Sequence, residues 1–388
     1  MTITGYEAKD LFSWLENRED FLLLDVRSAK DFERFKVEGP YPFDMINVSY
    51  YDFMEIEEEA VARIPRDRKI RIVCSKEGSA KYVAEILEKH GYQDVRYLAG
   101  GIKTWGNLLV PRLVNPGMGY ELYQFIRPGK ASCSYALLAG GEIMLFDPSR
   151  NVDFYLDFAR EKGARIIKTF ETHLQADYIA GSRMIAEKTG ALFLANENDF
   201  KGSKNNYIPL RDGEIHTFAA GGPGVRVLFT PGHTPGSTSF IVDEKFMLSG
   251  DMVFIKSIGR PDLGGKAVEW AGLLFDSMRM VQELDHDLVV LPGHFLSWDE
   301  ADDRLIFACT LGEAIERNRD IYSIDNLDDF VEFIQANMRP QPEEYATIRM
   351  VNANLKQVDD EEQEVLDLGK NECAASAYAK AQAAKEAA

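Results

Sequence analysis

Residues 171–178 read Glu-Thr-His-Leu-Gln-Ala-Asp-Tyr, and they come directly after an apolar stretch of strand type. His173 and Asp177 are therefore expected in a loop at the end of a strand, where binding and catalytic sites are usually built. A single histidine in such a loop is more often structural or merely exposed than a metal ligand. The importance of this stretch depends on whether other segments repeat its features.

Three other segments do repeat them. His233 lies in Thr-Pro-Gly-His-Thr-Pro-Gly-Ser, His294 ends Leu-Pro-Gly-His, and Asp251 ends Ser-Gly-Asp. The chain has only six histidines, so finding three of them in turns after apolar strands, with aspartates nearby, favours a metal site.

The surrounding chain, from Glu121 onward, predicts paired strands with occasional helices. Tyr135–Leu138 and Glu142–Phe146 flank Gly140-Gly141, which is a hairpin signal. Helices are expected at 151–162, 179–189 and 266–284, and a helical extension is expected from Asp299.

The first 110 residues instead alternate strand and helix signals, which predicts a small parallel sheet with helices on both faces. Cys74 directly follows one of these strands, and the next helix begins a few residues later. Backbone N–H groups and a helix N-terminus at that place stabilise a thiolate, and Lys76 can add positive charge. The simpler interpretation is a buried cysteine at the end of a strand.

Residues 3–108 resemble a rhodanese, a sulfurtransferase domain. The resemblance rests on Asp25-Val-Arg27, Ile46-Asn47, the Cys74 loop and the run from Leu98 to Trp105, in that order. It implies that Cys74 is the sulfur-carrying nucleophile and that Asp25 and Arg27 are scaffold residues near the loop. The loop departs from the common pattern Cys-x-x-Gly-x-Arg-Ser, because Glu77 and Ser79 hold the Gly and Arg places, and this leaves the substrate preference open.

Residues 121–297 resemble the metallo-β-lactamase superfamily, in its glyoxalase II-like branch. The family motif is His-x-His-x-Asp-His, then a His, a bridging Asp and a His, which together hold two metals. Here Gln175 replaces the second His and Tyr178 replaces the His after Asp177. Both replacements weaken a two-metal site, and water activation between two metals needs both ligand sets.

The ligands that survive at the first position are His173, His233 and Asp251. Two histidines and one carboxylate with open positions form the facial triad of non-haem Fe(II) oxygenases. The persulfide dioxygenases, also called sulfur dioxygenases, are the superfamily branch with this arrangement, and Gly259-Arg-Pro-Asp262 also resembles them. The resemblance implies one Fe(II) per chain, with zinc as a substitute, and a substrate pocket shaped by Arg260 and Asp262.

The remaining motif residues have two interpretations. Gln175 and Tyr178 can act from outside the ligand set, on a metal-bound water or a sulfur ligand. Asp177 and His294 are either the remains of a second metal site or hydrogen-bonding partners of the metal ligands. Arg260 can pair with a substrate carboxylate or form a structural pair with Asp262. Cys373 has no assigned role.

The fold class expected is α/β: a rhodanese parallel sheet with flanking helices, then an αββα metallo-β-lactamase sandwich with a helical C-terminal extension. We expect the sulfurtransferase domain at 1–108, a linker at 109–120, where prolines and glycines lack periodicity, the dioxygenase domain at 121–298 and the extension with its tail at 299–388.

The two chemistries suggest one hypothesis, a fusion enzyme of sulfide detoxification. A low-molecular-weight thiol persulfide, of glutathione or coenzyme A, is oxidised with O2 to sulfite, and Cys74 transfers sulfane sulfur between sulfite and thiosulfate. Fusion raises the effective concentration of the shared intermediate. The alternatives are a two-metal thioester hydrolase of glyoxalase II type and a sulfur-relay protein with a non-catalytic second domain.

The amino-acid composition limits the kinds of binding partner that we expect. Lys and Arg total 44 against 63 Asp and Glu, so the net charge of −19 argues against nucleic acid and anionic membrane surfaces. No apolar run approaches a membrane span and no signal peptide is visible. Four cysteines without a CxxC motif fit a reducing cytoplasm. A homo-oligomer is expected, since this superfamily branch commonly forms one.

Overall fold

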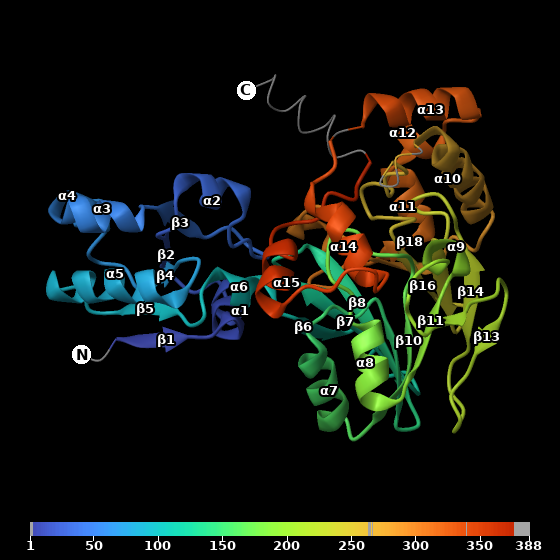
Figure 1. The fold of residues 1–388 in the computed structure, drawn as a ribbon, viewed down its shortest axis with the longest axis horizontal. Coiled ribbons are helices and arrows are strands. Elements are labelled where there is room, and N and C mark those ends of the chain that lie inside the picture. Colours follow the sequence, from blue (N-terminus) through green and yellow to red (C-terminus); the bar gives the residue numbers. More distant parts are fainter. Residues whose placement is uncertain (1–2, 263–264, 266, 339, 376–388) are drawn as a thin grey trace. The chain divides into compact units, whose positions relative to one another are not determined.

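The computed structural model describes residues 3–262, 265, 267–338 and 340–375 (Figure 1). The chain divides into two compact units. Unit 1 consists of residues 1–110 together with two short stretches from later in the chain, 127–130 and 368–370. Unit 2 holds the remaining residues.

Unit 1 is built on a five-stranded parallel sheet in the order β1-β5-β4-β2-β3. Its strands are β1 (Thr4–Tyr6), β2 (Leu22–Asp25), β3 (Asp44–Asn47), β4 (Ile70–Val73) and β5 (Val95–Leu98). Every residue of β2 and β4 is buried, which explains their nearly continuous apolar sequences.

Six helices accompany this sheet: α1 (Ala8–Glu16), α2 (Ala29–Arg34), α3 (Tyr50–Glu55), α4 (Glu57–Ala62), α5 (Glu77–Lys89) and α6 (Ile102–Gly106). Apolar residues of α3, α4 and α5 form one core cluster with those of β2 and β4. This cluster includes Cys74, which directly follows β4. The sheet therefore places Cys74 at the carboxyl edge of a central strand.

Unit 2 contains a seven-stranded sheet in the order β12-β11-β10-β9-β8-β7-β6. The strands are β6 (Val110–Leu113), β7 (Glu121–Arg127), β8 (Ser132–Ala139), β9 (Glu142–Phe146), β10 (Arg165–Phe170), β11 (Leu192–Ala195) and β12 (Ile208–Pro209). Gly140 and Gly141 connect β8 to β9 with φ values of 56° and 75°. Two consecutive left-handed residues are what a two-residue hairpin turn requires.

A second, six-stranded sheet has the order β13-β14-β15-β16-β17-β18. Its strands are β13 (Ile215–His216), β14 (Val225–Phe229), β15 (Thr238–Val242), β16 (Phe246–Gly250), β17 (Val289–Pro292) and β18 (Cys309–Thr310). The inner faces of the two sheets meet where Phe146 and Phe170 each contact Phe240, with ring centroids 5.2 Å apart in both pairs. The core of unit 2 therefore lies between two sheets.

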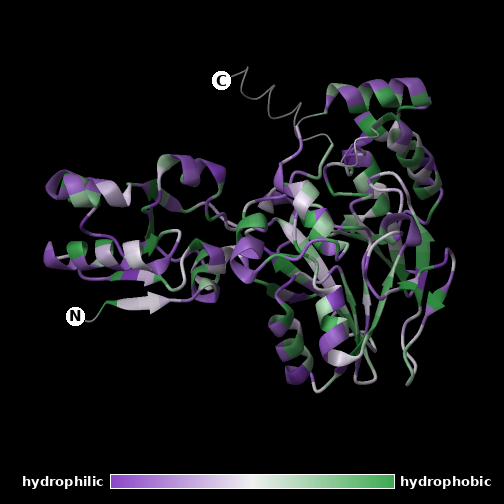
Figure 2. Cartoon of the chain, in the orientation of Figure 1, coloured by the Kyte–Doolittle hydropathy of each residue, from purple (hydrophilic) through white to green (hydrophobic). Residues whose placement is uncertain are grey.

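The helices of unit 2 are α7 (Val152–Glu161), α8 (Ser182–Thr189), α9 (Glu197–Phe200), α10 (Ala267–Gln282), the short 3-10 helix η1 (Trp298–Glu300), α11 (Leu311–Arg317), α12 (Arg319–Tyr322), α13 (Leu327–Ala336), α14 (Glu344–Asn352) and α15 (Asp360–Leu366). Helices α7 and α13 are striped with hydrophobic and hydrophilic residues, as expected for helices with one face on a core (Figure 2). The predicted α/β fold class, with a parallel sheet, a two-sheet unit and C-terminal helices, is confirmed.

The segment 109–120, which the sequence predicts as a linker, has regular structure in part. It contains strand β6, at one edge of the seven-stranded sheet. Pro111 fits there because an edge strand does not need every N–H for pairing. Within the described residues, no helix is long and apolar enough to cross a membrane.

Candidate metal centre

Three loops at strand ends bring the predicted ligands of unit 2 together. His173 lies shortly after β10, His233 lies in the turn between β14 and β15, and Asp251 directly follows β16. All three side chains are buried, with at most 3% of the residue surface exposed. Segments far apart in the sequence thus converge at one edge of the two-sheet core.

The three side chains point nitrogen and oxygen atoms at a common point. Asp251 Oδ2 lies 3.9 Å from His173 Nε2 and 3.4 Å from His233 Nε2. The two imidazole rings stand nearly perpendicular, at 88°, with centroids 4.9 Å apart. None of these three atoms has a hydrogen-bond partner although all are buried. Buried polar atoms without partners are costly, so this convergence indicates a bound ligand.

In both histidines, the second ring nitrogen, Nδ1, makes a hydrogen bond that orients the ring. His233 Nδ1 donates to the backbone carbonyl oxygen of Arg260 at 2.9 Å. His173 Nδ1 donates to Thr172 Oγ1 at 2.8 Å, and that hydroxyl donates to Asp147 Oδ2 at 2.8 Å. The proton on Nδ1 leaves the Nε2 lone pair of each ring directed at the common point. This is the usual arrangement behind a metal-bound histidine.

The electrostatics suit a cation. Burial lowers the pKa of His173 to about 3, so its imidazole is neutral at neutral pH. Burial alone would raise the pKa of Asp251, but the charge and hydrogen bond of His294 outweigh it, and the carboxyl pKa is lowered. Two imidazoles and an ionised carboxylate are the donor set of a divalent transition metal. The residues therefore fit the metal that the sequence predicted here.

His294 does not point at the same place. Its Nδ1 lies 2.8 Å from Asp251 Oδ1 and its Nε2 lies 3.0 Å from Asp177 Oδ2. Burial would lower the pKa of His294, but the two carboxylates raise it to about 10. An imidazolium thus bridges the two aspartates, and it fixes the orientation of Asp251 from the side opposite His173 and His233.

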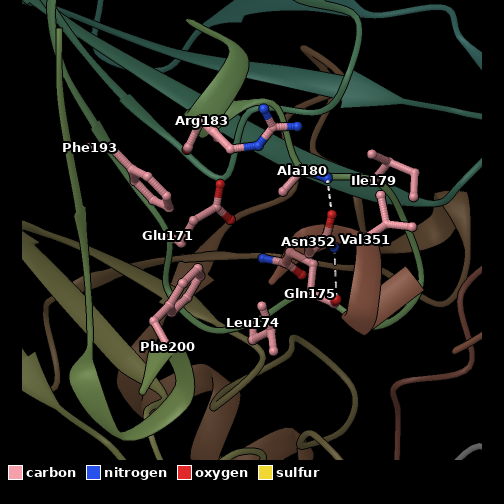
Figure 3. A pocket seen from close by; sticks show the side chains of 11 residues that line it. Glu171, Leu174, Gln175, Ile179, Ala180, Arg183, Phe193, Phe200, Val351 and Asn352 are labelled. Atoms are coloured by element: carbon pink, nitrogen blue, oxygen red, sulfur yellow. Dashed lines mark hydrogen bonds between the residues drawn. The ribbon is translucent and has the colours of Figure 1, made fainter. Parts of the chain in front are cut away.

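The two residues that replace family histidines are directed elsewhere. The phenol of Tyr178 donates to the backbone carbonyl oxygen of Asp147 at 3.3 Å. Gln175 lines a small cavity together with Glu171 (Figure 3). Asn352 of α14 holds this segment, because its amide nitrogen donates to the backbone oxygens of Gln175 and Tyr178 at 2.9 Å each.

The cavity has a volume of about 20 Å³, which is room for about one water molecule. Glu171 is 1% exposed, and burial raises its pKa well above the ordinary value. Arg183, Phe193 and Phe200 are among the other lining residues (Figure 3). None of the three converging side chains lines this cavity, so it lies beside the metal centre.

Arg260 and Asp262 form a buried ion pair. Arg260 Nε and Nη2 each lie 2.6 Å from a carboxylate oxygen of Asp262. The backbone of Arg260 also contributes, since its carbonyl oxygen orients His233 and its N–H donates to the carbonyl oxygen of Cys373 at 2.8 Å. These contacts support a structural role for the Arg260–Asp262 pair, because the segment that carries the pair orients His233.

Close approach explains two glycines of the site. A Cβ on Gly259 would lie 2.0 Å from the backbone oxygen of Asp251 and 2.9 Å from His233 Nδ1. A Cβ on Gly293 would lie 2.7 Å from Asp251 Oδ1. Only glycine lets these two loops approach Asp251 so closely, which gives the Pro-Gly-His and Gly-Arg motifs a physical basis.

Cys373 lies at the metal centre, although its position in the sequence does not indicate this. The thiol, which is 1% exposed, lies with Asp177 and His294 in a group whose ligand atoms are all within 4.8 Å of one another. Burial raises the pKa of the Cys373 thiol well above the ordinary value, and the charges of Asp177 and Asp251 raise it further. Cys373 comes from the segment after α15, far along the chain from the other members, so only the fold reveals this proximity.

In unit 1, Cys74 is buried between β4 and α5, and its carbonyl oxygen accepts a hydrogen bond from the N–H of Ile102 at 2.7 Å. Arg27 forms a buried ion pair with Asp25, in which Nη2 lies 2.6 Å from Oδ2. Asn47 donates to the backbone oxygens of Asp25 and Arg27 at 2.9 Å each. These contacts fix the ends of β2 and β3, and Lys76 precedes the first turn of α5.

Two protein-family models match the chain. The model described as a rhodanese-like domain matches residues 7–108, and that of the metallo-β-lactamase superfamily matches residues 127–294. The two matched regions correspond in order to the parallel sheet with Cys74 and to the two-sheet unit with the metal centre.

Two curated relatives carry different names. A hydroxyacylglutathione hydrolase of Anaeromyxobacter dehalogenans is 33% identical over 185 residues, which cover 48% of this chain and 68% of that protein. The mitochondrial persulfide dioxygenase ETHE1 of Bos taurus is 23% identical over 254 residues, which cover 64% of this chain and 93% of that protein.

Two solved structures show the same fold. A metallo-β-lactamase from Staphylococcus aureus is 28% identical, with a TM-score of 0.55, and the match covers 63% of this chain and 75% of that one. ETHE1 from Myxococcus xanthus is 23% identical, with a TM-score of 0.52, and the match covers 62% of this chain and all of that one.

Proposed function

The chain belongs to the metallo-β-lactamase superfamily and carries a rhodanese-like domain ahead of that fold, and from this premise we propose that it is a persulfide dioxygenase–sulfurtransferase. Its second unit would oxidise a low-molecular-weight thiol persulfide with O2 to sulfite. Its first unit would move sulfane sulfur through Cys74. We propose residues 1–108 for the sulfurtransferase domain and 121–298 for the dioxygenase domain, with 299–388 as a helical extension.

The observation that carries the proposal is the convergence of His173, His233 and Asp251. Their three inward atoms have no hydrogen-bond partners, whereas Gln175 and Tyr178 are directed away from them. Two histidines and one carboxylate on a single ion leave coordination positions open, which is the pattern of mononuclear Fe(II) oxygenases. An iron(II) ion held by these residues would supply the activation of dioxygen.

The protein's own groups would set the geometry for this chemistry. Thr172 and the backbone of Arg260 orient the two imidazoles through their Nδ1 atoms, and His294 orients the carboxylate. The three ligand side chains are shielded from bulk solvent, because all of them are almost completely buried. The overall reaction is balanced as R–S–SH + O2 + H2O giving R–SH, sulfite and two protons.

Cys74 would use the product of this reaction. A persulfide on Cys74 can donate its outer sulfur to sulfite, which gives thiosulfate and returns the cysteine as a thiol. The thiol partner is proposed as glutathione, coenzyme A or a similar small thiol, since the named relatives act on hydroxyacylglutathione or on persulfides.

A second candidate is a two-metal thioester hydrolase of glyoxalase II type. The group of Asp177, His294 and Cys373 favours it, because Cys373 can supply a donor atom where Tyr178 cannot. Against it, both ring nitrogens of His294 are engaged by carboxylates. A further metal held by His294 would have to displace one of these hydrogen bonds.

Metal analysis of protein purified anaerobically from iron-supplemented cells separates the candidates. About one iron per chain supports the dioxygenase. Two metals per chain, together with hydrolysis of lactoylglutathione, would replace it with the hydrolase. No metal in the wild-type protein would leave Cys74 as the catalytic group and support a sulfur-relay protein.

A further inference from the structure

Cys373 is held at the metal centre by backbone pairing. Its carbonyl oxygen accepts from the N–H of Arg260, the next residue pairs with Gly259, and the N–H of Ala375 donates to the carbonyl oxygen of Ile258 at 2.9 Å. Residues 373–375 therefore lie as a short antiparallel strand along 258–260, the segment whose Arg260 orients His233. A cysteine is placed here by main-chain contacts that do not depend on its side chain.

The thiol is connected to the three metal-facing atoms through His294. The Cys373 sulfur lies within 4.8 Å of a ring nitrogen of His294, and His294 Nδ1 lies 2.8 Å from Asp251 Oδ1. The other oxygen of this carboxylate, Oδ2, faces the unpartnered nitrogens of His173 and His233. A metal ion at that convergence would thus be separated from the Cys373 sulfur by one carboxylate and one imidazole, and one added sulfur atom lengthens the cysteine side chain by about 2.05 Å.

We propose that Cys373 carries the sulfur that is oxidised, so that the substrate of the metal centre is a protein-bound persulfide on the C-terminal segment. The inference rests on the proposed dioxygenase function and specifies its substrate. An external persulfide would then be the sulfur donor, and a diffusing thiol would not need to hold the sulfur during oxidation.

The chemistry is balanced in two steps. In the first, the sulfur of Cys373 bonds to the outer sulfur of R–S–SH, the S–S bond of the donor breaks, and the proton of Cys373 passes to the leaving thiolate to give R–SH. In the second, Cys373–S–SH, O2 and H2O give Cys373–SH, sulfite and two protons. The sulfane sulfur loses four electrons and dioxygen gains them.

The hydrogen bonds at His294 favour a carrier over a metal ligand. Cys373 would need His294 and Asp177 as co-ligands, but His294 Nε2 is engaged with Asp177 and His294 Nδ1 with Asp251. The Cys373 side chain also packs in an apolar cluster with Ala176, Phe254 and Tyr345. Cys373 is about as deeply buried as the three metal-facing side chains, so a small substrate reaches its sulfur no less easily than it reaches them.

The first experiment tests loading in the absence of metal and oxygen. Metal-free protein is incubated anaerobically with glutathione persulfide, freed of excess reagent, alkylated and digested, and its cysteine peptides are weighed. The Cys373 peptide is expected to gain one sulfur atom, while the buried Cys309 peptide stays unchanged. Loading of Cys373 in Cys74→Ser identifies the small persulfide as the donor, and its loss there identifies Cys74 as the donor.

The second experiment tests use of the loaded sulfur. Iron-loaded, persulfide-loaded protein is exposed to oxygen without added thiol, and sulfite is measured. We expect about one sulfite per loaded Cys373 and no sulfite from Cys373→Ser, with Cys309→Ser behaving like the wild type. Thermal melting of each variant shows that it is folded.

The outcomes separate this inference from the proposed function. If Cys373 is loaded but releases no sulfite, and free glutathione persulfide consumes no oxygen, the dioxygenase proposal fails. If Cys373 is never loaded, and Cys373→Ser oxidises glutathione persulfide at the wild-type rate, the carrier is wrong and the dioxygenase stands. If Cys373→Ser loses a metal equivalent, and the cobalt-substituted wild type has a thiolate charge-transfer band that this variant lacks, Cys373 is a ligand and the inference is overturned.

Discussion

His294 Nδ1 lies 2.8 Å from Asp251 Oδ1, so one oxygen of this buried carboxylate is fixed by an imidazole while the other faces His173 and His233. Because His294 also contacts Asp177 at 3.0 Å, the orientation of Asp251 is set by a chain of charged groups rather than by packing alone. The carboxylate is thereby presented to a metal with a single oxygen.

Replacement of Asp251 should remove the metal and the oxygen chemistry together. Asp251→Ala deletes the only anionic donor among the three convergent side chains, so bound iron and persulfide-dependent oxygen uptake should both be lost. Sulfur transfer to cyanide by Cys74 should persist. His286→Ala, at an exposed histidine, is the control and should behave like the wild type. Iron retained at the wild-type level in Asp251→Ala would contradict the ligand assignment.

The hydroxyl of Thr172 should matter although it does not face the metal. Thr172→Val keeps the shape of the side chain but removes the acceptor for His173 Nδ1–H. Loss of such a partner lowers metal affinity by about 10- to 100-fold. Thr172→Ser restores the hydroxyl and should restore affinity, as measured by competition with a chelator. Equal affinity in Thr172→Val and the wild type would rule out this positioning role.

Glycine at position 259 should be required for stability. A Cβ there would meet the backbone oxygen of Asp251 at 2.0 Å, so Gly259→Ala should lower the free energy of unfolding of metal-free protein by about 1–3 kcal/mol. Gly272 of α10 has nothing within 4 Å of the corresponding position, and Gly272→Ala should raise it by about 0.5–1 kcal/mol. Denaturant unfolding measures both, and similar effects at the two sites would refute the steric argument.

Loss of Cys74 should separate the two proposed reactions. Cys74→Ser should still produce sulfite from glutathione persulfide, because the metal centre lies in the other unit. It should no longer form thiosulfate. Sulfite and thiosulfate are quantified together by chromatography after alkylation, with Cys309→Ser as the matched control. Thiosulfate formed by Cys74→Ser at the wild-type rate would disprove the assigned role of Cys74.

The sequence was sufficient for the fold class and for the convergence of three residues, because strand-end loops and apolar periodicity are local features. His173, His233 and Asp251 each follow a strand, and adjacent strand ends meet at one edge. The hairpin at Gly140-Gly141 was equally local. Strand β6 was missed because Pro111 and the neighbouring glycines hide an edge strand.

The spacing of residues along the sequence does not predict contacts between distant segments. Nothing in the sequence places Cys373 beside His294, since the pairing of 373–375 with 258–260 is a tertiary contact. The sequence also does not indicate that Thr172 and Asp147 orient His173 through hydrogen bonds. Nor does it indicate that Asn352 of α14 binds the backbone of the loop that carries His173. Residues that orient a site seldom have a motif of their own.

The most direct test of the central claim is oxygen consumption by iron-loaded protein supplied with glutathione persulfide, followed with an oxygen electrode while sulfite is quantified. The account predicts uptake of about one O2 per sulfite formed, loss of both in Asp251→Ala, and retention of both in His286→Ala. Iron-loaded wild-type protein that consumes no oxygen with glutathione or coenzyme A persulfide, yet hydrolyses lactoylglutathione, would contradict it.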